Sequence, residues 1–357
     1  MRIIHVDTSD ERRYEVLVGP LEHSRGRLRE LANGRPLTLV TDERIWALHG
    51  ERVAALIPAE PIFVPEGEPA KSWGELQRLI ARFAELNLDR NRPIVAMGGG
   101  SVGDLTGLAA GLFKRGCPVV HIPTTLLAQA DSAVGGKTAI DAEGQKNLIG
   151  MFHQPALVLA DVGLLDTLDD RQLRAGYAEI VKYGLIGHEI VFDWLEDHGE
   201  KILAGDREMR EEAVHQAVSA KARIVEADTE DRTGLRALLN LGHTFAHAIE
   251  SAAGLGEVLH GEAVSIGMTL AFAFSDELGL CPEEDALRVR RHLEAAGLPT
   301  RLGQVSLDRA ALLPLMGADK KNADGKLRLV LVRGIGEAFL APDVPAEKLA
   351  GFLERAE

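Results

Sequence analysis

The sequence predicts an α/β N-terminal domain with a parallel sheet and a dinucleotide-binding glycine loop, followed by a mainly α-helical C-terminal domain. In the first half, short runs of Val, Ile and Leu alternate with helical patterns, which is typical of a parallel sheet. Beyond about Leu168, apolar residues recur at spacings of three and four, as they do in helices. Because 357 residues suggest about two domains, we expect them at residues 1–166 and 167–357.

Short apolar runs in the first half are predicted to be the strands of the sheet. These runs are Tyr14–Val18, Leu37–Thr41, Ile62–Val64, Ile94–Met97, Val119–Ile122 and Leu157–Leu159. Helical patterns separate several of the runs, at Leu21–Leu31, Trp73–Leu86 and Leu105–Phe113. In the second half, one late pair of strands is expected, at Leu327–Val332 and Glu337–Leu340.

A glycine-rich turn joins the predicted strand Ile94–Met97 to the helical pattern after it. Gly98, Gly100 and Gly103 match G-x-G-x-x-G between a strand and a helix, where backbone N–H groups favour a pyrophosphate. The acidic residue that usually follows about 20 positions later is missing, because His121 occupies that region. A plain tight turn is therefore the alternative to a phosphate-binding loop.

A second glycine-rich stretch resembles the end of a Walker A loop at Gly135–Thr138. Asp131 stands where that motif requires its first glycine, so we do not expect an ATPase. Lys137 and Lys146 lie in the same Gly-rich segment. They are candidates for a local anion cradle, and the alternative is that they are ordinary loop lysines.

Composition and charge exclude several classes of protein. Hydrophobic residues make up 46% and charged residues 26%, which is typical of globular proteins. With 40 basic and 54 acidic residues the net charge is −14, so we expect no nucleic-acid partner, and an anion must be met by a local group of Lys and Arg. Cys117 and Cys281 are too few for a disulfide framework or a Cys-based zinc site. A long uncharged stretch, Ala263–Ser275, is shorter than the roughly 20 residues of a membrane span, so we expect a cytoplasmic protein without a membrane partner.

Polar side chains recur with helical spacing in the apolar stretch Leu235–Glu250. If this stretch is one helix, Arg236, Asn240, His243 and His247 follow at steps of four, three and four and share one face. The rest of the helix is apolar, and a buried polar stripe must be satisfied by a partner. Several polar residues on one face favour a functional site over histidines that are hydrogen-bonded to the core backbone.

A third histidine and an upstream carboxylate complete a candidate metal site. His260 precedes another apolar helix, and Glu179 lies in a mostly apolar helical pattern with Lys182 three residues later. Two His and one Glu form the ligand set of an open catalytic zinc site. The spacing leaves open which two of His243, His247 and His260 bind, and the third would be an acid–base group. A surface ion pair is the alternative for Glu179 and Lys182.

Other lysines occupy unusual positions. Lys221 shares a helical face with Val214, Val218 and Val225, so it either extends its amino group to solvent or faces a site. Near the C-terminus, the basic run Asp319–Asn322 is either a site or a solvated turn.

Several of these stretches together resemble the 3-dehydroquinate synthase family. The resemblance covers the chain from about Glu66 to Lys321, in the order found in the family. The stretches are Glu66–Ser72, Gly98–Asp104, Pro123–Thr138, Lys146–Asn147, Glu179–Gly184, Leu238–His247 and His260–Glu262. Members of this family are homodimeric cytoplasmic enzymes of the shikimate pathway, which leads to the aromatic amino acids. They use NAD and a divalent metal, usually zinc with cobalt as an alternative.

The family converts 3-deoxy-D-arabino-heptulosonate 7-phosphate to 3-dehydroquinate and phosphate, so the resemblance implies a phosphate-eliminating lyase. NAD oxidises a secondary alcohol, phosphate leaves by β-elimination, NADH returns the hydride, and an intramolecular aldol step closes the ring. The implied substrate is a small anionic sugar phosphate, which an acidic chain must bind with locally gathered cations.

The resemblance also implies roles for individual residues. It makes Glu179, His243 and His260 the metal ligands, and His247 an acid–base group. It implies NAD contacts, with Asp131 near the nicotinamide, from Asp42, Glu66, Gly67, Glu68, Pro69, Ala70, Lys71, Gly100, Ser101, Val102, Gly103, Asp104, Thr124, Thr125, Asp131, Lys137, Lys146, Leu164, Leu165, Asp166 and Thr167. It places around the substrate Lys137, Lys146, Asn147, Lys182, Lys221, Arg236, Asn240 and one of Lys320 and Lys321, with Arg115 reaching the neighbouring subunit's site.

Other functions stay open as alternatives. Another sugar phosphate cyclase is one, although the resemblance implies that those relatives differ at the positions of Asn240 and His247. An NAD- and metal-dependent polyol or glycerol-phosphate dehydrogenase is a second, and it would release NADH. A non-enzymatic NAD-binding protein is a third, and it would not need the histidines. Without the resemblance, the residues predict an NAD- and metal-dependent enzyme acting on an anionic substrate.

Overall fold

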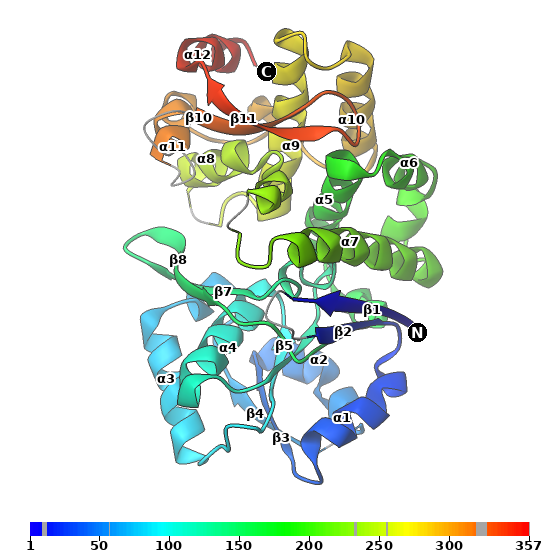
Figure 1. Cartoon of the computed structure of the whole chain (residues 1–357), viewed down its shortest axis with the longest axis vertical. Coiled ribbons are helices and arrows are strands. Elements are labelled where there is room, and N and C mark those ends of the chain that lie inside the picture. The colour runs from blue at the N-terminus through cyan, green and yellow to red at the C-terminus, as the bar shows by residue number, and fades with distance from the viewer. Residues whose placement is uncertain (9–12, 57, 232–233, 255, 319–326, 357) are drawn as a thin grey trace. The chain divides into compact units, whose positions relative to one another are not determined.

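The computed structural model describes residues 1–8, 13–56, 58–231, 234–254, 256–318 and 327–356. The chain divides into two compact units, which are described separately (Figure 1). The first unit consists of Met1–Asp169 and Arg207–Glu230, and the second of Asp170–Asp206 and Asp231–Glu357. Lys320 and Lys321, which the sequence analysis assigned to the substrate site, lie outside the described residues.

A seven-stranded sheet forms the centre of the first unit. All of its neighbouring strands are parallel except for the antiparallel edge pair β1·β2. The strand order is β1 (Arg2–Asp7), β2 (Arg13–Val18), β9 (Leu157–Ala160), β6 (Val119–Pro123), β5 (Ile94–Gly98), β3 (Leu37–Thr41) and β4 (Ala59–Phe63).

Helices cover both faces of this sheet. They are α1 (Arg25–Ala32) and α2 (Glu43–Ala54) on one face, and α3 (Trp73–Glu85) and α4 (Gly100–Leu112) on the other (Figure 1). Side chains of β5 alternate between the two apolar cores: Ile94 and Ala96 pack toward α3 and α4, while Val95 and Met97 pack toward α1 and α2. This double burial explains why the strand is a continuous apolar run.

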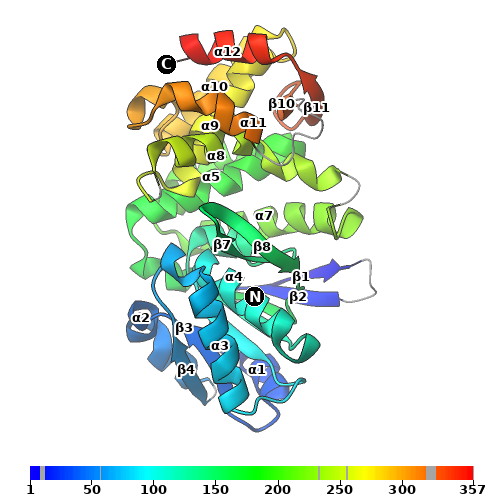
Figure 2. The ribbon, with the colours of Figure 1, turned by 90° about the vertical axis from the view of Figure 1, so that its left-hand side faces the viewer.

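Helix α7 (Arg207–Ala227) also belongs to the first unit. It lies beside β1 and β2 in Figures 1 and 2. Among their contacts, Arg2 forms an ion pair with Glu212, and the carboxylate of Glu226 accepts a hydrogen bond from the backbone N–H of Asp7 at 3.1 Å. A hairpin of β7 (Lys137–Ala142) and β8 (Gln145–Phe152) completes the regular elements of this unit's described residues.

The second unit is mainly helical, with a two-stranded antiparallel sheet. Its elements are α5 (Asp170–Gly187), α6 (Glu189–Leu203), α8 (His243–Ala253), α9 (His260–Glu277), α10 (Glu283–Ala295), α11 (Leu312–Ala318), β10 (Leu327–Val332), β11 (Ala338–Val344) and α12 (Ala346–Arg355). Helix α9 is mostly apolar and packs against α5, α8, α10 and β10. Among the described helices, none combines the length and the apolar character needed to cross a membrane.

Short helical turns connect many of these elements, and several carry residues of the candidate site. They are η1 (Leu21–Ser24), η2 (Glu68–Ala70), η3 (Phe113–Arg115), η4 (Ala128–Ser132), η5 (Val162–Thr167), η6 (Leu235–Asn240), η7 (Leu302–Gln304) and η8 (Arg309–Ala311).

The predicted fold class is confirmed, but one local prediction is wrong. The stretch Leu235–Glu250 is not one helix: η6 is a 3₁₀ turn, and α8 begins only at His243. Gly242 between them has a left-handed conformation with φ of 78°, which ends one element and starts the next. Its backbone lies so close to Gly267 and Met268 of α9 that a side chain would overlap them.

Candidate functional site

Three helices of the second unit bring together Glu179, His243 and His260. Glu179 lies on α5, His243 is the first residue of α8, and His260 is the first residue of α9. The Nε2 atoms of His243 and His260 lie 3.6 Å and 3.2 Å from Glu179 Oε1. One candidate ligand atom from each residue lies within 4.8 Å of the others, a spacing that fits one ion.

Glycines allow the three helices to approach closely enough for this cluster. A side chain at Gly261 would overlap the carbonyl oxygen of Ala175, which lies one turn before Glu179 on α5. A side chain at Gly267 would overlap the carbonyl oxygen of Gly242, which directly precedes His243. These helix contacts therefore determine the positions of the candidate ligands.

The chemistry of this donor set fits a divalent metal such as zinc. Burial holds the pKa of His243 well below its usual range although Glu179 opposes this, so the ring is neutral and able to bind a metal. Burial also lowers the pKa of His260, but hydrogen bonds to Glu179 and Glu250 outweigh it and raise the pKa to about 10. A metal that binds here must therefore displace a proton from His260.

Lys182 lies directly beside this cluster. Its Nζ atom is 2.6 Å from Glu179 Oε2, and both side chains are fully buried. The amino group also lies 5.0 Å from the centre of the Tyr183 ring. Lys182, which the sequence analysis assigned to the substrate, is thus the cation that balances the carboxylate of the candidate metal site.

His247 lies next to the cluster but outside the group of three. Its ring centre is 5.7 Å from that of His243 and 6.2 Å from that of His260. His247 is exposed, whereas His243 is buried. The structure therefore places ring nitrogens of His243 and His260 beside Glu179, which supports these two histidines as the candidate ligands.

Arg236 and Asn240, which were predicted to share one helix with His243 and His247, lie in the turn η6. The side chain of Arg236 is almost completely buried. The side-chain amide of Asn240 donates a hydrogen bond to the carbonyl oxygen of Ala237 at 3.2 Å. Both residues belong to the same unit as the Glu179 cluster.

In the first unit, the predicted glycine loop joins the carboxyl end of β5 to the first turn of α4. A Cβ atom on Gly99 would lie 3.2 Å from the side chain of Thr125, and one on Gly100 would lie 3.2 Å from Ser132. Glycines at these positions keep open the space in front of the helix N-terminus, where unpaired N–H groups suit a phosphate. The loop therefore fits the pyrophosphate of a dinucleotide.

A pocket lies at this loop. It is lined by residues that include Gly98, Gly100, Asp104, Lys137 and Ser132. Other predicted cofactor residues lie around it: Gly103 also lines the pocket, Ser101 and Val102 lie in the first turn of α4, and Thr124 donates its backbone N–H to the carbonyl of Gly98 at 2.9 Å. Residues of the glycine loop, of the carboxyl end of β6 and of the β7·β8 hairpin therefore lie together at this pocket.

The segment Gly67–Lys71, which is also predicted to bind the cofactor, contacts Asp104 of this pocket through Lys71. Gly67 has a positive φ of 71°, and Glu68, Pro69 and Ala70 form η2. Lys71 is buried and donates hydrogen bonds to Asp104 Oδ2 at 2.9 Å and to Asn147 Oδ1.

These contacts determine the charge on Lys71. Burial lowers the pKa of Lys71, but Asp104 and Glu68 outweigh this effect and raise it, so the amino group keeps its charge. Asn147 was predicted to face the substrate, and its side chain lies against a residue predicted to bind the cofactor. Its backbone N–H donates to Asp141 at 2.7 Å.

Asp131 and Lys221 are also brought together within the first unit. Asp131 lies in η4, a π-helical turn, and such turns are frequent at functional sites. The Nζ atom of Lys221 on α7 lies 2.5 Å from Asp131 Oδ1 and 2.8 Å from its carbonyl oxygen. Lys221 therefore occupies an apolar position on α7, and its amino group contacts Asp131, the residue predicted to lie near the nicotinamide.

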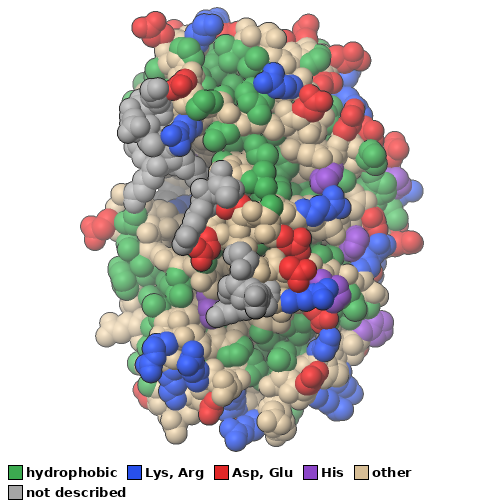
Figure 3. Space-filling view, in the orientation of Figure 1, with side chains coloured by type: hydrophobic (Ala, Val, Ile, Leu, Met, Phe, Trp, Pro, Cys, Tyr) green, Lys and Arg blue, Asp and Glu red, His purple; other side chains and the backbone are tan. Residues whose placement is uncertain are grey.

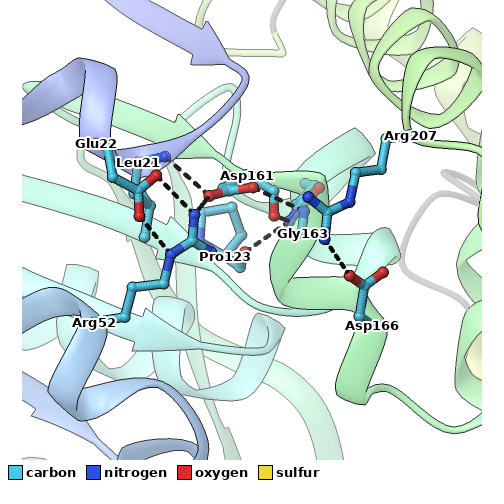
Figure 4. A network of polar contacts seen from close by, with 9 residues as sticks. Leu21, Glu22, Arg52, Pro123, Asp161, Gly163, Asp166 and Arg207 are labelled. Atoms are coloured by element: carbon cyan, nitrogen blue, oxygen red, sulfur yellow. Dashed lines mark hydrogen bonds and ion pairs between the residues drawn. The ribbon is translucent and has the colours of Figure 1, made fainter.

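A polar network surrounds Asp161 at the carboxyl end of β9. In this segment no site residue was predicted before Leu164. The carboxylate of Asp161 accepts hydrogen bonds from the backbone N–H groups of Leu21 at 2.9 Å and Gly163 at 2.8 Å (Figure 4). It also accepts one from Arg52 at 2.6 Å, and Arg52 in turn binds Glu22. Several Asp residues follow predicted strands, and nothing in the sequence distinguishes Asp161 from the others.

Gln129 is a second residue for which the sequence contains no individual signal. Its buried side-chain amide donates to the carbonyl oxygens of Pro123 at 3.0 Å and Asp161 at 2.8 Å. It therefore ties together the carboxyl ends of β6 and β9, beside the candidate cofactor pocket.

The turn η5 carries the predicted cofactor residues Leu164, Leu165, Asp166 and Thr167. Asp166 accepts hydrogen bonds from Arg207 at 2.7 Å and Arg210 at 3.2 Å, both on α7. Thr167 Oγ1 lies 2.9 Å from His49 Nε2. The side chains of Leu164 and Leu165 are buried in the core.

The remaining predicted residues also belong to the first unit. The carboxylate of Asp42 accepts the backbone N–H of Ile45 at 2.8 Å and caps α2, and Glu66 pairs with Arg44 at 2.8 Å. Lys146 on β8 is exposed. Arg115 is exposed at the end of η3 with a positive φ of 64°.

On the face of the molecule that Figure 3 shows, Lys and Arg side chains are interspersed with Asp and Glu. Several cations predicted for the two candidate sites are instead buried, away from this mixed surface. They are Lys71, Lys182, Lys221 and Arg236, each nine-tenths or more buried.

His121 replaces the acidic residue that the dinucleotide motif usually has. It lies on β6 and lines the glycine-loop pocket, where a Cβ atom on Gly103 would meet its ring at 3.5 Å. Burial lowers the pKa of His121 to about 4, with a smaller contribution from His153. The side chain is therefore a neutral group in the wall of the candidate cofactor pocket.

We expect His121 to make the folded protein less stable as the pH falls from 6.5 to 4. The unfolded chain binds a proton at His121 near pH 6.5, whereas the folded chain resists it until about pH 4. Stability is therefore full above pH 6.5, and the loss reaches roughly 3 kcal/mol below both pKa values. Denaturant unfolding of the wild type and of His121→Gln, each at about pH 7.5 and about pH 5, measures this. An equal loss in both proteins would contradict the assignment.

Comparisons with known proteins show the family of the chain. The family model 3-dehydroquinate synthase N-terminal matches residues 61–175, and the model 3-dehydroquinate synthase C-terminal matches residues 176–322. A 3-dehydroquinate synthase from Caulobacter vibrioides is 50% identical over 355 residues, which cover 96% of each chain. The chain belongs to the 3-dehydroquinate synthase family. The resemblance that the sequence motifs carry is thereby confirmed.

Solved structures of related enzymes resemble this member of the 3-dehydroquinate synthase family over its length. A 2-epi-5-epi-valiolone synthase from Streptomyces hygroscopicus, with NAD+ and Zn2+ bound, has a TM-score of 0.85 and 31% identity, and 96% of each chain is covered. A 2-deoxy-scyllo-inosose synthase complexed with carbaglucose-6-phosphate, NAD+ and Co2+ has a TM-score of 0.89 and 26% identity over 100% of both chains. Both neighbours therefore contain the cofactors that the sequence predicts for this chain.

Proposed function

We propose that this chain is a 3-dehydroquinate synthase, which converts 3-deoxy-D-arabino-heptulosonate 7-phosphate to 3-dehydroquinate and phosphate. The observation that carries the proposal is the 50% identity, over 96% of both chains, to a protein with that name. The cluster of Glu179, His243 and His260 and the glycine-loop pocket support it, because the reaction needs both a metal and NAD.

The glycine-loop pocket is proposed to hold NAD, which accepts the hydride of a substrate alcohol and returns it within one turnover. Gly99 and Gly100 leave room for the pyrophosphate. Lys71 and Asp104, which hold each other at 2.9 Å, are proposed to position the cofactor beside the loop. The pair of Asp131 and Lys221 is proposed to define the nicotinamide end.

Glu179, His243 and His260 are proposed to hold the metal, which when bound lowers the cost of removing a proton from the substrate hydroxyl. Lys182 forms an ion pair with Glu179 within the protein interior and balances its negative charge. His247 presents an exposed imidazole beside this cluster and is proposed to accept and return protons.

The anionic substrate requires cations that compensate for a chain of net charge −14. Arg236, which is buried in the second unit, is proposed to be one of the cations that bind the carboxylate and phosphate. Arg236 offers a planar group with paired donors, which suits a carboxylate or phosphate in a fixed orientation.

With substrate and NAD present, we expect phosphate to appear without a matching accumulation of NADH. The same bound cofactor must accept and return the hydride, so the reaction has no net redox change. Phosphate release and absorbance of NADH, recorded together with and without NAD and zinc, test this. NADH formed in proportion to product would contradict the proposal and favour a metal-dependent polyol or glycerol-phosphate dehydrogenase.

The similarity to other sugar phosphate cyclases gives a second candidate function. A heptulose 7-phosphate that lacks the carboxylate of the proposed substrate distinguishes the two. We expect this analogue to release phosphate much more slowly, because a site built for a carboxylate leaves its cations unpaired when that group is missing. Equal or faster turnover of the analogue would assign the chain to another cyclase.

We also propose a homodimer, a contribution of Arg115 to the neighbouring subunit's site, and a cytoplasmic location. The exposed position and left-handed backbone of Arg115 support the second, because strained residues often serve a ligand or partner.

A further inference from the structure

Glu250 is a buried carboxylate beside the candidate metal cluster to which the proposed function assigns no role. It lies on α8, seven residues after His243, and two helical turns place both residues on the same face. Its side chain is only 7% exposed. Its Oε2 atom lies 3.2 Å from Nδ1 of His260.

The two ring nitrogens of His260 have different partners. Nδ1 faces Glu250, whereas Nε2 faces Glu179 Oε1 at 3.2 Å. His243 has the same arrangement with a different acceptor, because its Nδ1 lies 3.2 Å from the carbonyl oxygen of Leu241. In both histidines Nδ1 has a fixed acceptor, and Nε2 is directed toward the carboxylate of the cluster.

This arrangement determines which nitrogen can bind a metal. A neutral imidazole carries one N–H, and the other nitrogen has the lone pair. When Nδ1 donates its hydrogen to a carboxylate, Nε2 keeps its lone pair and becomes more basic. The side chain of His260 is 33% exposed, whereas that of His243 is 10% exposed. Packing therefore restrains the His260 ring less, and its orientation depends more on this hydrogen bond.

We propose that Glu250 is a positioning residue of the metal centre, which accepts a hydrogen bond from Nδ1 of His260 and so directs Nε2 to the metal. The proposal rests on the metal site that the proposed function assigns to Glu179, His243 and His260. Glu250 acts through His260 and does not itself contact the metal or the substrate.

Metal affinity tests this role without the enzymatic reaction. Zinc and cobalt affinities of the wild type, Glu250→Ala and Glu250→Gln are measured by competition with a chelator. We expect Glu250→Ala to bind about 10- to 100-fold more weakly, which is typical of lost partners of metal-binding histidines. Glu250→Gln retains an oxygen acceptor but loses the charge, so its affinity should lie between those of the wild type and Glu250→Ala. The visible absorption of bound cobalt should change in Glu250→Ala, because the His260 ring is no longer held in one orientation.

Glu257→Ala is the matched control, since it removes an exposed carboxylate only three residues before His260. We expect this variant to bind metal as the wild type does, which excludes a general effect of negative charge. Unfolding of each metal-free protein is measured alongside, and if Glu250→Ala does not fold, Glu250→Gln decides.

Wild-type metal affinity in the folded Glu250 variants, or an equal loss in Glu257→Ala, would overturn the proposal. A loss of turnover with unchanged metal affinity would also overturn it, since Glu250 would then act on the reaction itself. Failure of the proposed function is recognised separately: the wild type would bind metal but release no phosphate from the heptulosonate phosphate.

Discussion

Glu179→Gln is expected to remove most of the bound metal and most of the activity. Glu179 faces both candidate histidine ligands, so the variant replaces the one anionic ligand of a three-residue set by a neutral amide. It also leaves the charge of Lys182, 2.6 Å away, to repel a divalent cation. We expect metal affinity and turnover each to fall by more than about 100-fold, beyond the effect of losing a ligand's hydrogen-bond partner. Metal analysis after dialysis and phosphate release measure the two losses.

Glu200→Gln makes the same change of charge on the exposed surface of α6 and serves as the control. Because Lys182 is buried, unfolding of Glu179→Gln is measured as well, which separates loss of metal from loss of structure. His243→Ala and His260→Ala should lose metal in the same way. A variant that keeps one metal per chain would exclude its residue from the ligand set.

The central strands of the sheet could be predicted because burial on both faces requires continuous apolar runs. Strand β1 lacks that signal: it lies at an edge, and only Ile4 and Val6 of its side chains are buried. The β7·β8 hairpin was hidden for a similar reason, since most residues of β8 are exposed or half-buried. In both places, pairing with a neighbouring strand determines the structure more than local composition does.

The candidate metal site shows where helical spacing is informative and where it fails. The spacing correctly placed His243 and His247 on one face of a helix, but it extended that helix through Gly242. A glycine within a helical pattern was the available signal for a break. Arg236 and Asn240 lie in the 3₁₀ turn η6, whose period of three residues does not place two residues four positions apart on one face.

The choice among the three histidines could not come from spacing, because it depends on a residue far away in the sequence. Glu179 lies on α5, and the contact of α5 with α9 requires that Gly261 has no side chain. Glu250 could have been singled out as a third polar residue on the face of His243 and His247. Nothing in the sequence indicates that its partner is His260, since that contact also depends on how α8 packs against α9.

His247→Ala is expected to retain the metal and to lose activity. The exposed ring of His247 lies 5.7 Å from that of His243, measured between ring centres, and is not among the three residues whose ligand atoms converge. Removing it therefore leaves Glu179, His243 and His260 in place. The loss of a general acid–base group typically reduces turnover by about 100-fold or more.

Metal content and turnover of His247→Ala, measured beside those of His243→Ala, distinguish a ligand from an acid–base group. Both histidines lie on α8 and both variants lose one imidazole, so any general cost to the helix is shared. We expect about one metal per chain in His247→Ala and little in His243→Ala, with turnover strongly reduced in both. A metal-free His247→Ala would make His247 a ligand, and His260 would then need to be tested as the acid–base group.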